Sequence, residues 1–138
     1  MPRPTTSAVP SETQSYSAQE VSEAALKGFF HLAERWRLDT REQLALLGQP
    51  PRSTFFAWKK GTKAVLSQDT LERISYLLGI WKALRILIPD DSQAEAWVKK
   101  PNGNPLFDGG APIERMTRGR IMDLADVRRL LDARRGVW

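Results

Sequence analysis

Apolar residues recur every three or four positions through several stretches of this chain, the spacing that places them on one face of an α-helix. The clearest stretches are residues 17–38, 41–47, 68–88 and 122–133, with shorter helices expected before Gly61, before residue 98 and over residues 112–117. Only the last few residues resemble a short extended segment. The pattern therefore predicts an all-α fold.

The long helix over residues 68–88 is apolar on more than one face after Leu77. A helix of this kind must be buried on two sides. One side can pack on the preceding helices, whereas the other needs either the C-terminal segment or a second copy of the chain. Pro89 stops this helix, and we expect Asp91 or Ser92 to cap the next one.

A tight turn separates two short helices between residues 46 and 61. Gly48 tolerates a positive φ angle, and the two prolines that follow cannot continue the first helix. We expect Ser53 or Thr54 to cap the second helix. Two short helices joined by a glycine turn are typical of a helix-turn-helix unit, which binds DNA.

The second short helix has an apolar face and a basic face. Phe55 and Trp58 lie three residues apart, so we expect both to pack in the core. The segment from Gln49 to Lys63 contains four basic residues and no acidic one. Because the start of such a helix reaches base edges while flanking basic groups hold phosphates, we predict the DNA contacts to be Arg52, Ser53, Thr54, Phe56, Lys59, Lys60 and Lys63.

Composition narrows the possible chemistry. The net charge of +5 suits a polyanionic partner, and the absence of cysteine excludes disulfides and thiolate metal sites. His31 has no ligand cluster around it, and Gly109-Gly110 lacks the strand and lysine of a phosphate-binding loop. We therefore expect no metal, no cofactor and no enzyme activity. Without a bilayer-spanning run or a signal peptide, we expect a cytoplasmic protein.

Several motifs, in order, resemble the Xre/MbcA/ParS antitoxins. They are LLG-x-x-x-R-S-T-x-x-x-W-K-x-G at 46–61, L-S-x-D-x-L-E-R-I-S-x-L-L-G-I-W-K-A-L-R at 66–85, A-W-V-K-K-P-N at 96–102, F-D-G-G-A-P at 107–112 and D-A-R-R-G at 132–136. The resemblance implies an Xre-like helix-turn-helix followed by a small helical toxin-binding domain. Members neutralise a RES-domain toxin, which resembles ADP-ribosyltransferases and consumes NAD, and they repress their own operon.

The resemblance also implies an organisation of the chain. We expect a flexible N-terminal tail over residues 1–17, a DNA-binding and dimerisation domain over 18–88, and a toxin-binding domain over 89–138. Because the family typically dimerises, we expect a homodimer within a larger toxin–antitoxin complex, with dimer contacts at Leu78, Trp81, Leu84 and Leu87. The expected toxin contacts are Trp97, Asn102, Phe107, Arg134, Arg135, Val137 and Trp138.

The C-terminal end suggests how neutralisation works. We hypothesise that residues 136–138 enter the toxin's NAD pocket, where Trp138 or the terminal carboxylate blocks it. Arg134 and Arg135 would pair with acidic groups at the mouth of that pocket. Two alternatives remain at this point: a stand-alone helix-turn-helix regulator with a closed ligand pocket in its C-terminal half, and a structural adaptor that does not bind DNA.

Overall fold

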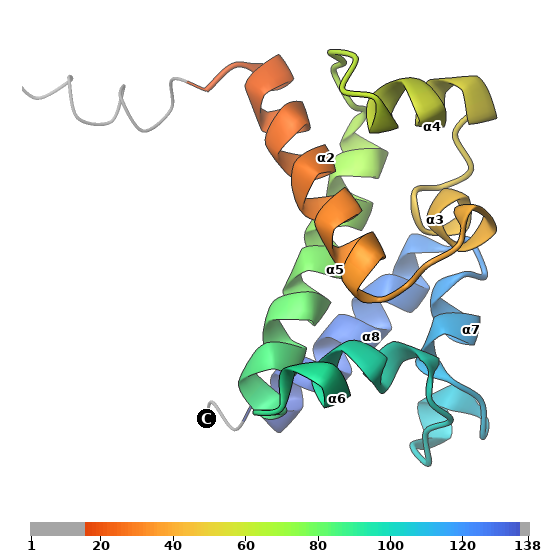
Figure 1. Ribbon diagram of the computed structural model, residues 1–138. Helices are drawn as coiled ribbons and strands as arrows, with labels where there is room; N and C mark the ends of the chain where they lie inside the picture. Colours follow the sequence, from red (N-terminus) through yellow and green to blue (C-terminus); the bar gives the residue numbers. More distant parts are fainter. Residues whose placement is uncertain (1–15, 136–138) are drawn as a thin grey trace, which may run out of the picture.

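A computed structural model describes residues 16–135 of the chain (Figure 1). The described residues form α-helices and two 3-10 turns, without a strand, which confirms the predicted all-α fold. In chain order these elements are α2 (Ala18–Arg35), α3 (Thr40–Leu46), α4 (Arg52–Lys59), α5 (Gln68–Leu87), α6 (Asp91–Ala96), η1 (Trp97–Lys99), η2 (Pro105–Phe107), α7 (Pro112–Met116) and α8 (Ile121–Arg134). Most of the predicted N-terminal tail, with Val137 and Trp138, lies outside the described residues.

Capping boxes start the first two helices. The Ser17 hydroxyl accepts the backbone N–H of Glu20, and the Glu20 carboxylate accepts the N–H of Ser17. This backbone hydrogen bond lowers the pKa of Glu20. Asp39 and Glu42 form the same reciprocal pair at the start of α3. Both helices end a residue or more earlier than their apolar patterns indicate.

The turn between α3 and α4 depends on Gly48, as predicted. Gly48 has φ +88°, and Gln49 after it is also left-handed, with φ +62°. The Gln49 N–H donates to the Leu44 carbonyl at 2.8 Å, and the Gly48 N–H donates to the Ala45 carbonyl at 3.2 Å. These two bonds satisfy carbonyls that the end of α3 would leave unpaired. Gly61 ends α4 in the same way, at φ +93°.

Two predicted helix caps are wrong. Neither Ser53 nor Thr54 caps α4, because the helix already begins at Arg52 with Pro51 as its N-cap. Proline fixes φ near the helical value and starts the helix without a side-chain hydrogen bond. The cap of α6 is Asp90, whose carboxylate accepts the N–H of Gln93 at 3.0 Å. The residues predicted as caps therefore lie inside the first turn of each helix.

Helix α5 is the central element, with α2 packed on one side and α8 on the other (Figure 1). Leu77, Ile80 and Ala83 are completely buried. The second apolar face of α5 is thus covered by the chain's own C-terminal helix, so this face no longer argues for a second copy of the chain. Leu84 is only 1% exposed and lies in this core. Its predicted dimer contact stays a prediction, since burial within one chain does not show which residues a second copy meets.

The glycine- and proline-rich loop between η1 and α7 is held by side-chain caps. The side-chain Oδ1 of Asn102 accepts the backbone N–H of Asn104, and the side-chain Oδ1 of Asn104 accepts the backbone N–H of Leu106. The Asn102 backbone N–H crosses the loop to the Gly110 carbonyl at 3.0 Å.

Within residues 16–135, no helix is both long enough and apolar enough to cross a membrane.

Candidate functional site

The first candidate site is the outer face of α4. Its inner face carries Phe55, which is 0% exposed and packs edge-on against Phe30 with ring centroids 5.8 Å apart. Trp58 is half-buried against the same core. The predicted core position of Phe55 is confirmed, and Trp58 is only partly covered. This packing fixes which side of α4 faces solvent.

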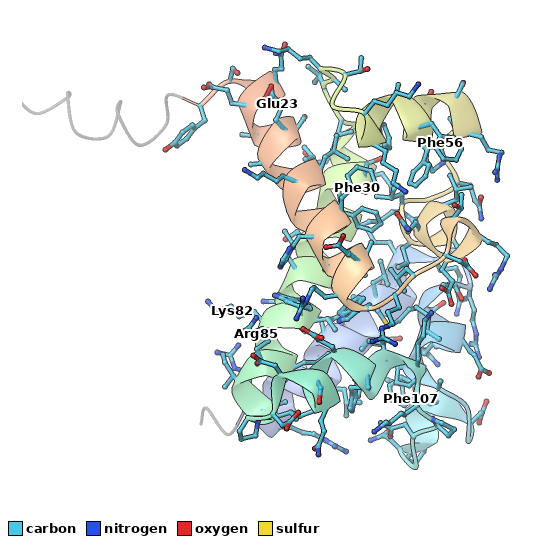
Figure 2. All side chains as sticks on the ribbon, viewed as in Figure 1. Glu23, Phe30, Phe56, Lys82, Arg85 and Phe107 are labelled. Atoms are coloured by element: carbon cyan, nitrogen blue, oxygen red, sulfur yellow. The ribbon has the colours of Figure 1, made fainter. Side chains whose placement is uncertain are left out.

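The outward face of α4 brings together most of the predicted DNA contacts. Arg52, Ser53, Phe56, Lys59, Lys60 and Lys63 are exposed, and Thr54 is half-buried. The Arg52 guanidinium carbon lies 5.7 Å from the centre of the Phe56 ring, which holds Arg52 at the start of the helix. Figure 2 shows Phe56 near the outer edge of the molecule.

The charge of this face is not neutralised by the rest of the chain. Across residues 16–135, Arg52, Lys59, Lys60 and Lys63 enter no ion pair. The first turn of α4 has neither an acidic residue nor a side-chain cap. Its backbone N–H groups and the positive end of the helix dipole therefore point toward solvent with the basic side chains, an arrangement suited to phosphate groups.

The second candidate site is the C-terminal region, where the predicted toxin contacts separate into two groups. Trp97 is half-buried and meets Phe107 edge-on with ring centroids 5.9 Å apart. Phe107 is 5% exposed, so it supports Trp97 from the core, and its predicted toxin contact stays a prediction. Asn102 is half-buried and shapes the loop. Arg134 and Arg135 are exposed near the end of α8.

An apolar groove of about 260 Å³ opens beside this end of α8. Leu87, Trp97 and Arg134 share it, although the sequence placed Leu87 with the dimer contacts and the other two with the toxin contacts. The remaining lining residues are Leu84, Ile88 and Leu131. Among the predicted dimer contacts, Leu78, Trp81 and Leu87 are half-buried. The groove therefore lies at the C-terminal end of α8, where Arg134 borders it.

An ion-pair network that the sequence did not reveal joins α7 to α8. Arg115 lies 3.2 Å from the buried carboxylate of Asp123 and 3.0 Å from that of Asp126, and it also donates to the Leu106 carbonyl. Burial raises the pKa of Asp126, but hydrogen bonds from Arg115 and Arg129 outweigh this effect and lower the pKa overall. In the sequence, only the spacing of Asp123 and Asp126, three residues apart, indicates that both carboxylates could face one cation.

Arg73 is a second residue whose role the sequence did not reveal. It is 9% exposed, and its Nε donates to Asp69 at 2.8 Å while its Nη2 donates to the Gly119 carbonyl at 2.9 Å. A Cβ atom at Gly48 would lie 2.9 Å from the Nε of Arg73. Arg73 therefore fills the space between the turn of the helix-turn-helix and the loop before α8.

The described residues contain no group of three or more acidic, histidine or cysteine side chains placed to hold a metal ion. His31 is exposed and lies edge-on to Trp81 with ring centroids 5.8 Å apart. Its surroundings in this part of the chain are those of a surface helix residue.

Comparison with known proteins agrees with this geometry. Residues 17–79 match the family model of the antitoxin Xre-like helix-turn-helix domain, and residues 83–136 match that of the antitoxin Xre/MbcA/ParS C-terminal toxin-binding domain. The chain is also 49% identical over 113 residues to y4oB, an uncharacterized protein of Sinorhizobium fredii, covering 82% of this chain and 85% of that one. The chain belongs to the Xre/MbcA/ParS family of antitoxins.

Proposed function

We propose that this antitoxin neutralises a RES-domain, NAD-consuming toxin in the cytoplasm and represses its own operon through α4. The observation that supports the DNA-binding half is the unpaired basic face of α4, with Arg52 at its start and Lys59 and Lys60 at its end. The observation that supports the neutralising half is the apolar groove that Trp97 and Arg134 share at the C-terminal end of α8.

In this account the DNA contacts are those on and just after α4. Arg52 reads a base edge, and the three lysines hold phosphates. Ser53, Thr54 and Phe56 complete the surface of α4 that faces the groove of the DNA. The domain division at residues 17 and 88 belongs to the same proposal, although the α5–α8 packing joins the two halves into one helical body.

Neutralisation is assigned to the C-terminal end. Residues 136–138 enter the toxin's NAD pocket, while Arg134 and Arg135 pair with acidic groups around it. Trp97 and Asn102 contribute from the preceding loop and turn. A homodimer is compatible with the half-buried Leu78, Trp81 and Leu87.

Co-expression with the protein of the neighbouring reading frame, which this proposal takes to be a RES-domain toxin, tests the neutralising half. We expect the full chain to restore growth and to be recovered in complex with the toxin. A chain without its last four residues should fail to restore growth. Unchanged rescue by this shortened chain would contradict the assignment to the C-terminal end, whereas failure of the full chain would contradict the choice of toxin.

The alternative of a stand-alone regulator requires a closed ligand pocket in the C-terminal half. The hollows that the C-terminal residues border are surface grooves, formed in one case with Arg35 and Arg37 of the first half. They do not favour that alternative.

A further inference from the structure

The short loop Arg118-Gly119-Arg120, between α7 and α8, lies beside the turn of the helix-turn-helix. The side chain of Arg73 connects the two, because it packs under Gly48 and donates to the Gly119 carbonyl at 2.9 Å. Figure 1 shows the α7–α8 connection next to α3, on the same edge of the molecule as the start of α4. A loop of the toxin-binding region is thus fixed against the DNA-binding unit.

Both arginines of this loop present their charge to solvent. Arg118 is exposed and forms no ion pair within residues 16–135. The Arg120 side chain is 70% exposed and lies 3.4 Å from Asp123, whose shorter contact is to Arg115 at 3.2 Å. Asp123 and Asp126 together face three guanidinium groups, those of Arg115, Arg120 and Arg129. One positive charge of this cluster therefore is not neutralised, and the exposed Arg120 can offer it to another partner.

The position of these charges relative to α4 identifies the partner. Gly48 precedes the start of α4 by a short turn, so the loop lies on the side of Arg52, whereas Lys59, Lys60 and Lys63 lie at the opposite end of the helix. DNA-binding units of this class hold the backbone phosphates on both sides of the groove that the helix enters. Basic side chains on both sides of α4 match this requirement.

We propose that Arg118 and Arg120 form a second phosphate-binding site, which holds the DNA backbone next to the start of α4. This inference rests on the proposed DNA-binding function and extends it to the C-terminal region. The contact is to phosphates alone, so it adds affinity without sequence preference. Arg73 is a positioning residue for this site, because it fixes the loop against the turn.

Titration of the full-length chain against two duplexes, over a series of salt concentrations, tests the inference. One duplex carries the upstream region of the chain's own gene and the other has a random sequence. Each lost arginine–phosphate contact should reduce the slope of log K against log salt by about 1. We expect Arg118→Ala to lower the slope by this amount on both duplexes, and Arg118→Ala/Arg120→Ala to lower it by about 2.

The matched control is Lys82→Ala, which removes the same charge from the exposed face of α5. Figure 2 shows Lys82 at the opposite edge of the molecule from Phe56. Lys82→Ala should leave the slope of log K against log salt unchanged. The charge-retaining variant Arg118→Lys/Arg120→Lys should keep a slope close to that of the wild-type chain. Thermal denaturation of each variant shows whether the start of α8 remains folded, and the charge-retaining variant separates lost charge from lost structure.

The outcomes are distinguishable. If the wild-type chain binds both duplexes with a steep salt dependence but Arg118→Ala behaves like Lys82→Ala, the second phosphate site does not exist while the proposed function stands. If the wild-type chain binds neither duplex, the proposed DNA-binding function itself fails and this inference fails with it. Loss of toxin capture without any change in DNA binding would assign the loop to the protein partner and overturn the inference.

Discussion

At the scale of single residues, Phe55 and Phe56 are neighbours in sequence with opposite surroundings. Phe55 is 0% exposed, whereas Phe56 is 38% exposed and lies under the Arg52 guanidinium. The helical period predicted this difference, because residue 55 shares a face with Trp58 and residue 56 does not. The contact between Arg52 and Phe56 follows from their spacing of four residues on one helix.

This pair of residues gives the first prediction. Phe55→Ala should lower the free energy of unfolding by about 3–5 kcal/mol, since it empties a fully buried aromatic site. Phe56→Ala should change stability by less than about 1 kcal/mol and instead weaken binding to promoter DNA. Urea denaturation and DNA titration measure the two effects. Equal destabilisation by both variants would contradict the assigned faces of α4.

Asp126 gives a prediction about pH. Its pKa is lowered in the folded chain, because hydrogen bonds from Arg115 and Arg129 outweigh the effect of burial. A carboxylate with a lowered pKa stabilises the fold above its unfolded pKa, and this stabilisation disappears as the pH falls through the folded value. Asp126→Asn should therefore cost about 1 kcal/mol or less near neutral pH and nothing in acid.

Denaturation midpoints measured from neutral to acidic pH test this expectation. Asp91→Asn is a suitable control, because the Asp91 side chain is 65% exposed and lies 3.6 Å from Arg85. The difference between wild type and Asp126→Asn should shrink with acidification. A difference that is constant across the pH range would show that Asp126 acts through packing.

At the scale of elements, the residues that form the capping boxes of α2 and α3 stand together in the sequence, whereas the start of α4 was predicted at the wrong residues. A capping box depends on residues three positions apart, so the sequence contains all of it. The start of α4 depends on Pro51, which is still extended, with φ −57° and ψ 142°, so that Arg52 is the first helical residue. Serine and threonine are common caps, but here Ser53 and Thr54 come two and three residues after the cap position.

The turn between α3 and α4 permits a matched comparison of two glycines. Gly48 and Gly61 both have a positive φ angle, but only at Gly48 would an added Cβ meet another side chain, at 2.9 Å from Arg73 Nε. Gly61→Ala should cost about 1–2 kcal/mol from backbone strain. Gly48→Ala should cost more, because it also displaces Arg73, and it should weaken DNA binding. Equal losses in chemical denaturation would show that the Arg73 contact is unimportant.

At the scale of the whole molecule, α8 covers the second apolar face of α5, so the two halves of the chain share one core. The apolar pattern required a second layer on α5, but it could not distinguish the C-terminal segment from a second chain, because either provides the same burial. For the same reason the sequence did not reveal the bridge from Arg73 to Gly119, which joins residues 46 positions apart. Helix faces were predictable, and contacts between distant segments were not.

Removal of the C-terminal half tests this shared core. A chain that ends at Ile88 exposes the face of α5 that α8 covers, so it should lose cooperative thermal unfolding. A chain that ends at Arg135 retains α8 and is the control. A cooperative transition in the shorter chain, at a temperature near that of the control, would show that the helix-turn-helix half folds independently.

We propose that α4 is needed for repression and not for neutralisation, because it binds the promoter while the end of the chain blocks the toxin. The most direct test is growth rescue by the variant Arg52→Ala/Lys59→Ala/Lys60→Ala, measured in cells that express the RES-domain toxin and carry a reporter for the chain's own promoter. We expect this variant to restore growth like the wild-type chain and to lose repression of the reporter. Loss of rescue by the folded variant, or repression that persists, would contradict the account.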